Sequence, residues 1–129
     1  MDEKKKVPGS YPRILIVEED LATLDLYRRE LSQEFDVNAC ATKDDALEFL
    51  NGTALDAVVL EPDAFNGQGW ELLNALAQPA RHKSLPVILC SVLDERKHGI
   101  ASGATVFLVK PILPTQLSET LHQVLEKQR

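Results

Sequence analysis

Short apolar runs alternate with amphipathic segments along the whole chain, a pattern that predicts strands alternating with helices. The expected strands cover residues 13–17, 35–40, 56–61, 85–91 and 105–109. The expected helices cover about residues 24–34, 42–52, 69–76, 94–102 and 113–126, where apolar residues recur at helical spacing. Strands and helices that alternate in this way predict one α/β domain with a parallel sheet covered on both faces.

Turn and capping residues support several of these boundaries. Thr42 is a suitable N-cap with Asp45 three residues later, and Asn51-Gly52 is a common helix stop. Gly99 lies inside the expected helix over 94–102, where glycine costs about 1 kcal/mol relative to alanine, so this helix should be the loosest of the five. Residues 1–12 are charged and contain Gly and Pro, which predicts a flexible leader before a domain over 13–129.

Composition narrows the class of protein. The chain has 129 residues, a hydrophobic content of 44% and a net charge of -6. The negative charge argues against direct nucleic-acid binding by this domain. We find no apolar run of the roughly 18 residues that a membrane span needs, and no signal peptide, so we expect a cytoplasmic protein without a membrane segment. Cys40 and Cys90 both lie in apolar runs, which predicts buried, reduced thiols.

The most informative stretch is the apolar run from Asp56 to Glu61, which Pro62 and a glycine-containing loop follow. Pro62 favours extended backbone at Glu61 and cannot donate a hydrogen bond, so the strand should end there. Polar groups also follow the other strands at the same end of the predicted sheet. They are Glu18, Glu19 and Asp20 after the first strand, Ser91 at the end of the fourth and Lys110 after the fifth.

The carboxyl ends of parallel strands lie side by side, so these groups should meet in one shallow cleft. Clustered carboxylates bind Mg²⁺, while an ammonium and a hydroxyl can contact phosphoryl oxygens. A carboxylate at position 61 could act as a nucleophile toward a phosphoryl group. The combination favours phosphoryl chemistry.

These motifs together resemble the receiver domain of two-component response regulators over residues 13 to about 127. The resemblance implies a flavodoxin-like, doubly wound sheet with strand order 2-1-3-4-5 and five helices. It also implies that Glu61 stands at the phosphoacceptor position, that Ser91 and Phe107 form a switch, and that the Lys110-Pro111 peptide bond is cis. The residues it places around the phosphoryl group and Mg²⁺ are Glu18, Glu19, Glu61, Asp63 (through its backbone carbonyl), Ser91 and Lys110.

The chain departs from the family pattern at its two most important acids, because Glu61 and Glu19 stand where the family usually has aspartate. An extra methylene displaces a carboxylate by roughly 1 Å, which can cost about 100-fold in a positioned reaction. Glu19 should also narrow the space for Mg²⁺, which tolerates distorted octahedra poorly. Phe65 and Gln68 depart from the pattern of the following loop as well. We therefore expect no conventional phosphorylation and a doubtful Mg²⁺ site.

Two interpretations of Glu61 stay open. In the first, its carboxylate reaches Lys110 and Ser91 and partly mimics a phosphoryl group, with one negative charge against roughly two. In the second, the site is inert and the cleft only supports an interaction surface.

The function we expect is a non-enzymatic signalling module that binds a histidine kinase, a phosphotransfer domain or an effector domain. By resemblance, the contact face consists of the fourth helix, fifth strand and fifth helix, with Arg96, Lys97, His98, Phe107, Gln116 and Glu119. One alternative is an active phosphoacceptor that uses Glu61 with Mg²⁺. The other is a flavodoxin-like small-molecule binder, which would need a phosphate-binding loop, but this chain has no G-x-G-x-x-G after a strand. A hydrolase is disfavoured because His82, His98 and His122 have no nucleophile motif beside them.

Overall fold

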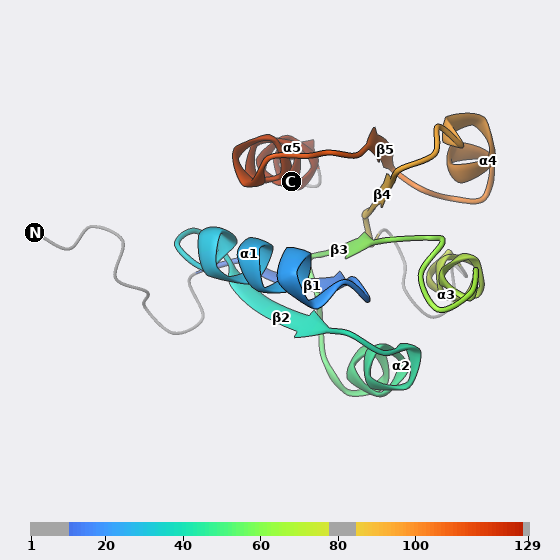
Figure 1. The fold of residues 1–129 in the computed structure, drawn as a ribbon. Coiled ribbons are helices and arrows are strands. Elements are labelled where there is room, and N and C mark those ends of the chain that lie inside the picture. The colour runs from blue at the N-terminus through green and yellow to red at the C-terminus, as the bar shows by residue number, and fades with distance from the viewer. Residues whose placement is uncertain (1–10, 78–84, 128–129) are drawn as a thin grey trace, which may run out of the picture.

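Parallel strands form one sheet in the computed structural model, which describes residues 11–77 and 85–127 (Figure 1). The strands are β1 (Arg13–Val17), β2 (Asp36–Cys40), β3 (Ala57–Leu60), β4 (Val87–Ser91) and β5 (Val106–Val109). The helices are α1 (Leu21–Leu31), α2 (Lys43–Gly52), α3 (Gly69–Leu76), α4 (Arg96–Ala101) and α5 (Pro114–Lys127). Within the described residues the strand order is β2-β1-β3-β4-β5, so the predicted doubly wound fold is confirmed.

The helices cover the sheet in two layers. Helices α1 and α5 lie on one face, and α2, α3 and α4 lie on the other (Figure 1). Each face of the sheet has its own apolar core, one with Ile14, Ile16 and Val59 and the other with Leu15 and Val58. The central strands are therefore buried on both sides, which explains why their sequences are continuous apolar runs.

Side-chain alternation along the strands decides which polar group faces which layer. Ile16 of β1, Val59 of β3 and Leu108 of β5 all lie in the core beneath α1 and α5. Successive side chains of a strand point to opposite faces, so residues two positions further on share a face. The residues at those positions are Glu18, Glu61 and Lys110. Ser91 follows Leu89, which lies in the opposite core, so its side chain starts from the α3–α4 side.

Several predicted boundaries are corrected by the structure. Helix α1 begins at Leu21, because the Asp20 carboxylate caps its first turn by accepting a hydrogen bond from the Thr23 backbone nitrogen at 3.0 Å. The helix ends at Leu31. Helix α4 is shorter than the predicted 94–102. The predicted Thr42 cap is confirmed, with the Asp45 nitrogen 3.1 Å from the Thr42 hydroxyl oxygen.

The leader predicted over 1–12 lies largely outside the described residues, as does His82. Pro12 belongs to the ordered domain, because its carbonyl oxygen accepts a hydrogen bond from the Asp36 nitrogen at 2.8 Å. Cys40 and Cys90 are buried free thiols, as predicted. In the described part of the chain, no helix combines the length and the apolar character that crossing a membrane requires.

Candidate functional site

An ammonium held between two carboxylates occupies the centre of the cleft. The Lys110 Nζ atom lies 2.5 Å from a Glu18 oxygen and 2.5 Å from a Glu61 oxygen. Backbone hydrogen bonds beyond the strand ends fix this geometry: the Glu61 nitrogen donates to the Val17 carbonyl at 3.1 Å, and the Lys110 nitrogen donates to the Ser91 carbonyl at 2.7 Å. The sheet register thus brings together three residues that follow different strands and are 43 or more positions apart in sequence.

Burial dominates the electrostatics of this cluster. The side chains of Glu61 and Lys110 are only 11% and 14% exposed. Burial raises the pKa of the Glu61 carboxyl, and the hydrogen bond and charge of Lys110 oppose that rise without cancelling it. Burial lowers the pKa of the Lys110 ammonium, but hydrogen bonds and charges from Glu18 and Glu61 outweigh it and leave that pKa above its ordinary value. The lysine therefore stays charged at neutral pH.

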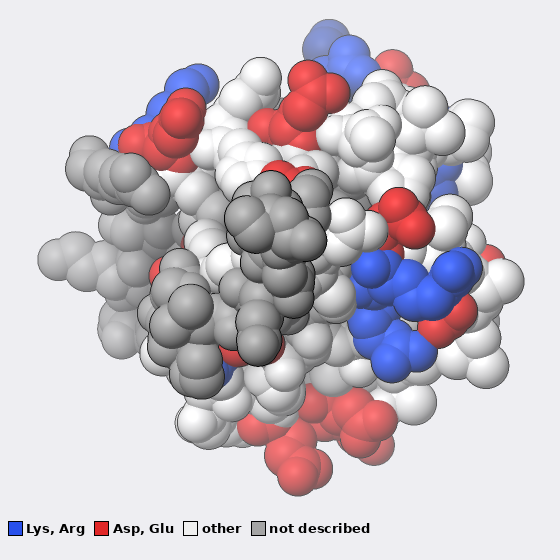
Figure 2. Space-filling model, turned by 90° about the vertical axis from the view of Figure 1, so that its left-hand side faces the viewer, with Lys and Arg blue, Asp and Glu red and all other residues white. Residues whose placement is uncertain are grey.

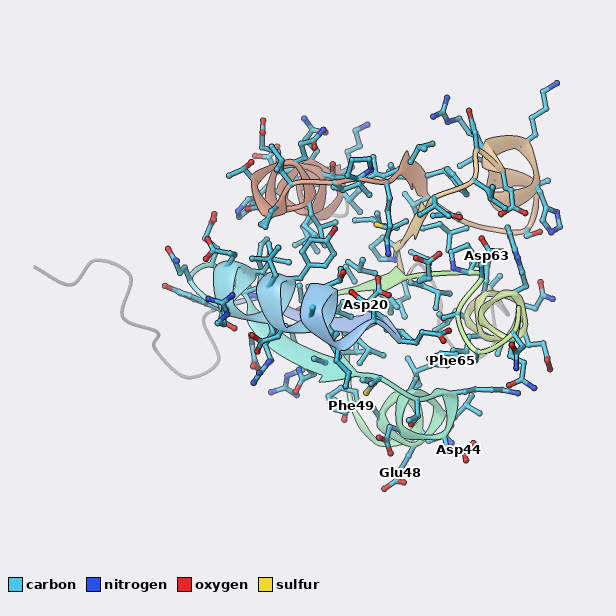
Figure 3. The ribbon with its side chains drawn as sticks, in the orientation of Figure 1. Asp20, Asp44, Glu48, Phe49, Asp63 and Phe65 are labelled. Carbon is cyan, nitrogen blue, oxygen red and sulfur yellow. The ribbon has the colours of Figure 1, made fainter. Side chains whose placement is uncertain are left out.

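Glu19 links two loops of the cleft. Its carboxylate accepts a hydrogen bond from the Phe65 nitrogen at 2.5 Å, which joins the β1–α1 loop to the β3–α3 loop. Phe65 and Asn66 have φ of 58° and 57°, a left-handed conformation that is uncommon for residues other than glycine. Figure 3 labels Phe65 and Asp63 in this loop and Asp20 at the start of α1. Asp20 is exposed and caps α1, so its carboxylate is not part of the central cluster.

The Ser91 hydroxyl is bound by Asp63 and not by Glu61. The Ser91 Oγ atom donates a hydrogen bond to an Asp63 carboxylate oxygen at 2.7 Å, and Ser91 is completely buried. The expectation that Glu61 reaches both Lys110 and Ser91 is therefore half right, since the ion pair with Lys110 is present and the serine has a different partner. The physical reason is the alternation described above, which starts the two side chains from opposite faces of the sheet.

The residues that the resemblance assigns to Mg²⁺ do not fit the ion in this chain. The Glu18 oxygens are bound by Lys110 and by the Asp20 nitrogen, at 2.5 Å and 3.1 Å. One Glu19 oxygen accepts from the Phe65 nitrogen, and the Asp63 backbone carbonyl accepts from the Gly67 nitrogen at 3.3 Å. Within residues 11–77 and 85–127, no group of three or more His, Cys, Asp or Glu side chains is arranged to hold a metal ion. Both Glu18 oxygens and one Glu19 oxygen would have to leave protein donors in order to bind a metal ion.

Phe107 lies in the core and not on the predicted partner face. Its side chain is 5% exposed and packs in the same apolar cluster as Leu89 and Ala104. The other predicted face residues are exposed: Arg96, Lys97, His98, Gln116 and Glu119. The His98 ring lies 4.1 Å from the Trp70 ring, which connects α4 with α3. His122 is separate from the cleft and contacts Glu34 at 2.7 Å.

Lys110 is reached from outside through an open groove of about 370 Å³. The groove is lined by Thr23, Leu26, Tyr27, Val92, Lys110, Pro111 and Ile112. The Lys110-Pro111 peptide bond is cis, as predicted. On the opposite side of the molecule, toward the amino ends of the strands, basic side chains lie beside acidic ones (Figure 2). The ion pairs of the described residues include Arg28 with Asp25 in α1 and Arg13 with Asp36 at the starts of β1 and β2.

Sequence reasoning missed two contacts of the site. They are the hydrogen bond from the Ser91 hydroxyl to the Asp63 carboxylate and the one from the Phe65 nitrogen to Glu19. Asp63 was expected to act through its backbone carbonyl, and its side chain proves to make the contact with Ser91. The alternation of side chains along β4 could have shown that Glu61 does not reach Ser91. Ile88 faces the same side of the sheet as Glu61, and Ser91 lies an odd number of residues from Ile88, so its side chain faces the opposite side. The Glu19–Phe65 bond spans 46 residues and involves a backbone nitrogen, so no sequence pattern reveals it.

Comparison with known proteins identifies what this arrangement is similar to. The family model for the response regulator receiver domain matches residues 14–122. The chain is 29% identical over 120 residues to the phosphate regulon transcriptional regulatory protein PhoB of Rhizobium meliloti (strain 1021), and this match covers 90% of the chain and 53% of PhoB. It is 30% identical over 122 residues to the transcriptional regulatory protein PrrA of Mycobacterium leprae (strain TN), covering 92% and 52%. The chain thus spans about half the length of these two relatives.

Solved structures show the same fold. The receiver domain protein (CheY-like) from Methanospirillum hungatei JF-1 aligns with a TM-score of 0.83 at 24% identity, covering 92% of this chain and 97% of that one. At this identity the likeness supports the fold alone.

Proposed function

The chain belongs to the response regulator receiver domain family, and from that premise we propose that it is a two-component signalling module that works without phosphorylation of its cleft. It transmits a signal by binding proteins and has no enzymatic activity of its own. The cleft needs no Mg²⁺ in this proposal, because the acids that would hold the ion are bound to protein donors.

The observation that carries the proposal is the contact between Glu61 and Lys110. A glutamate carboxylate stands at the phosphoacceptor position and lies 2.5 Å from the ammonium that the family pattern assigns to the phosphoryl group. A buried ammonium paired with two carboxylates has little remaining attraction for a third anion. A phosphoryl group entering here would have to displace Glu61 from Lys110 and add negative charge to a site that already holds two acids.

The second switch contact is also occupied. The Ser91 hydroxyl has one proton, and it is donated to Asp63 at 2.7 Å. Phe107 is already packed inward against the core. Both residues that the resemblance assigns to the switch therefore have fixed partners without a phosphoryl group, which supports one permanent signalling state.

Partner binding in this proposal uses the α4–β5–α5 face, where Arg96, Lys97, His98, Gln116 and Glu119 are exposed. The partner classes are a histidine kinase, a phosphotransfer domain or an effector domain, and the proposed location is the cytoplasm. The test is NMR mapping of the labelled domain with the cytoplasmic part of a co-expressed sensor kinase. Resonances of these face residues should shift, whereas those of Arg28 and Arg29 on α1 should not. Shifts confined to α1 would contradict the proposed face.

Phosphorylation is tested by intact-mass spectrometry after incubation with Mg²⁺ and acetyl phosphate. The wild-type chain should gain no phosphoryl group. The Glu61→Asp variant restores the family's acceptor residue and serves as the reactive comparison, while Glu61→Gln has no carboxylate at this position. Labelling of Glu61→Asp alone would show that one methylene silences an otherwise competent cleft. Labelling of neither protein would show that Glu19 and the loop close it as well, and both results support the proposal.

Phosphoryl transfer to the wild-type chain would overturn the proposal in favour of an active acceptor. In that case the modified residue, found by peptide sequencing, should be Glu61, because the acyl phosphate of a glutamate is chemically possible. Loss of the label in Glu61→Gln would then establish the alternative.

A further inference from the structure

We propose that Asp63 is a positioning residue that fixes the β4–α4 loop, and with it the start of α4, through the hydroxyl of Ser91. The proposal concerns the same cleft but holds whether or not Glu61 accepts a phosphoryl group. Asp63 comes from the β3–α3 loop, near the carboxyl ends of the strands (Figure 3), and Ser91 is the last residue of β4. The contact thus joins two loops that are 28 residues apart in sequence.

A chain of hydrogen bonds continues from this contact into the loop. The Ser91 Oγ atom donates to Asp63 at 2.7 Å and accepts from the Leu93 nitrogen at 3.2 Å. The Leu93 carbonyl accepts from the Glu95 nitrogen at 3.1 Å, and Glu95 is the N-cap residue of α4. Each step in this series orients the next, so the position of the serine hydroxyl determines where α4 begins.

The carboxylate of Asp63 is well suited to this role. A hydrogen bond to an ionised acceptor is shorter and stronger than one between neutral groups. Ser91 is completely buried, so water does not compete for its hydroxyl. Because a hydroxyl has one proton, Asp63 also competes directly with any other oxygen that approaches the serine. The loop residues Val92 and Leu93 are 68% and 57% exposed, so their own side chains contribute little packing that could hold the loop.

The chain itself offers a comparison of two neighbouring acids. Glu61 contacts Lys110 and has no contact with Ser91 among the described residues, whereas Asp63 contacts Ser91. The removal of one acid should therefore affect the region around Lys110, and the removal of the other should affect the loop from Val92 to Glu95. This separation allows the proposal to fail without affecting the proposed absence of phosphorylation.

The test is NMR hydrogen exchange at the Leu93 amide in the Asp63→Ala, Ser91→Ala and double variants, without a phosphodonor. Asp63→Ala should raise the exchange rate about tenfold or more, in keeping with the loss of a hydrogen bond to a charged group. Ser91→Ala should raise it at least as much, and the double variant should add no further increase, because both changes break the same series of contacts. Asp63→Asn keeps an acceptor oxygen and should restore most of the protection.

Asp44→Ala is the matched control, since it removes an exposed carboxylate from the first turn of α2 (Figure 3). It should leave the Leu93 amide unchanged, and circular dichroism should show every variant folded. Additive effects of Asp63→Ala and Ser91→Ala would overturn the proposal, as would an unchanged Leu93 amide in Asp63→Ala. If Asp63→Ala does not fold, Asp63→Leu, which also has no acceptor oxygen, gives the same comparison with and without Ser91→Ala.

Discussion

The ring of Phe107 packs directly against the backbone of Gly99. A Cβ atom at position 99 would lie 2.7 Å from the Phe107 Cδ2 atom and 2.9 Å from a methyl carbon of Leu89. The sequence suggested that this glycine only weakens α4. The structure adds a second consequence, because the missing side chain leaves room for the buried aromatic ring.

Substitution of Gly99 by alanine should therefore destabilise the domain although alanine favours helices. The new methyl group overpacks the core at a cost of about 1–3 kcal/mol, against a gain of about 1 kcal/mol in helix propensity. The free energy of unfolding, measured by urea denaturation, should fall by about 1 kcal/mol. Gly52→Ala is the control, since nothing lies within 4 Å of its added Cβ atom. A Gly99→Ala variant as stable as wild type, with Phe107 in place, would contradict this packing.

Hydrophobic patterning predicts the fold almost completely. All five strands follow from apolar runs separated by helical periodicity, whereas their order is what the resemblance to receiver domains implies, and the described residues confirm both. The cluster of Glu18, Glu61 and Lys110 also follows, because parallel strands end at one edge and these residues share one side of the sheet. The Thr42 cap is equally local. Such features depend on neighbours in sequence or on the period of the strand, and both are visible in the residues themselves.

Contacts made by loops are much harder to predict. The partner of Ser91 depends on how the β3–α3 loop folds back, with left-handed backbone at Phe65 and Asn66. No periodicity governs that path. The burial of Phe107 depends in turn on a glycine in another element. These details require the three-dimensional packing, and they decide which acid holds which part of the cleft.

The charge of Glu61 should cost stability at neutral pH. Burial raises the pKa of this carboxyl above its ordinary 4.5. A group with a raised pKa in the folded state contributes stability below its unfolded pKa, and that contribution is lost as the pH rises through the folded value. Glu61→Gln cannot ionise and has no such loss. The stability of Glu61→Gln relative to wild type should therefore increase between about pH 4 and about pH 7 in urea titrations.

The exposed residue Glu119 provides the control for this comparison. Glu119→Gln removes a carboxylate from the exposed surface of α5 and leaves Lys110 and its two acids unchanged. A relative stability of Glu61→Gln that decreases with rising pH would mean that the attraction to Lys110 exceeds the effect of burial.

Tyr27 should ionise well above the ordinary range of a tyrosine. Its hydroxyl donates to the Ile112 carbonyl at 2.9 Å, and burial raises its pKa to about 12. The neutral Tyr27 side chain should contribute stability below pH 10, and this contribution should be lost as the pH rises toward the raised pKa of about 12. Ultraviolet absorbance of tyrosinate should show a phase near pH 12 that Tyr27→Phe lacks. The same variant should be about 1 kcal/mol less stable at neutral pH, because the Ile112 carbonyl loses its donor. A tyrosinate signal from Tyr27 near pH 10 in the folded protein would contradict the assignment.

Glu95 should hold a proton at a pH where an ordinary glutamate has lost it. Its Oε1 atom is shielded from solvent and, within the described residues, has no hydrogen-bond donor. Burial raises the pKa of Glu95, and the negative charge of Asp63 raises it further, while the charge of His98 lowers it.

The measurement is an NMR titration of the Glu95 side-chain carbon. The midpoint should lie above the ordinary 4.5 in the wild-type chain and should move toward that value in Asp63→Ala. Removal of the opposing charge in His98→Gln should move it further up. The protonated form of Glu95 contributes stability at low pH, and this contribution disappears as the pH rises through the raised midpoint. A midpoint unaffected by Asp63→Ala would show that burial, and not the charge of Asp63, raises the pKa of Glu95.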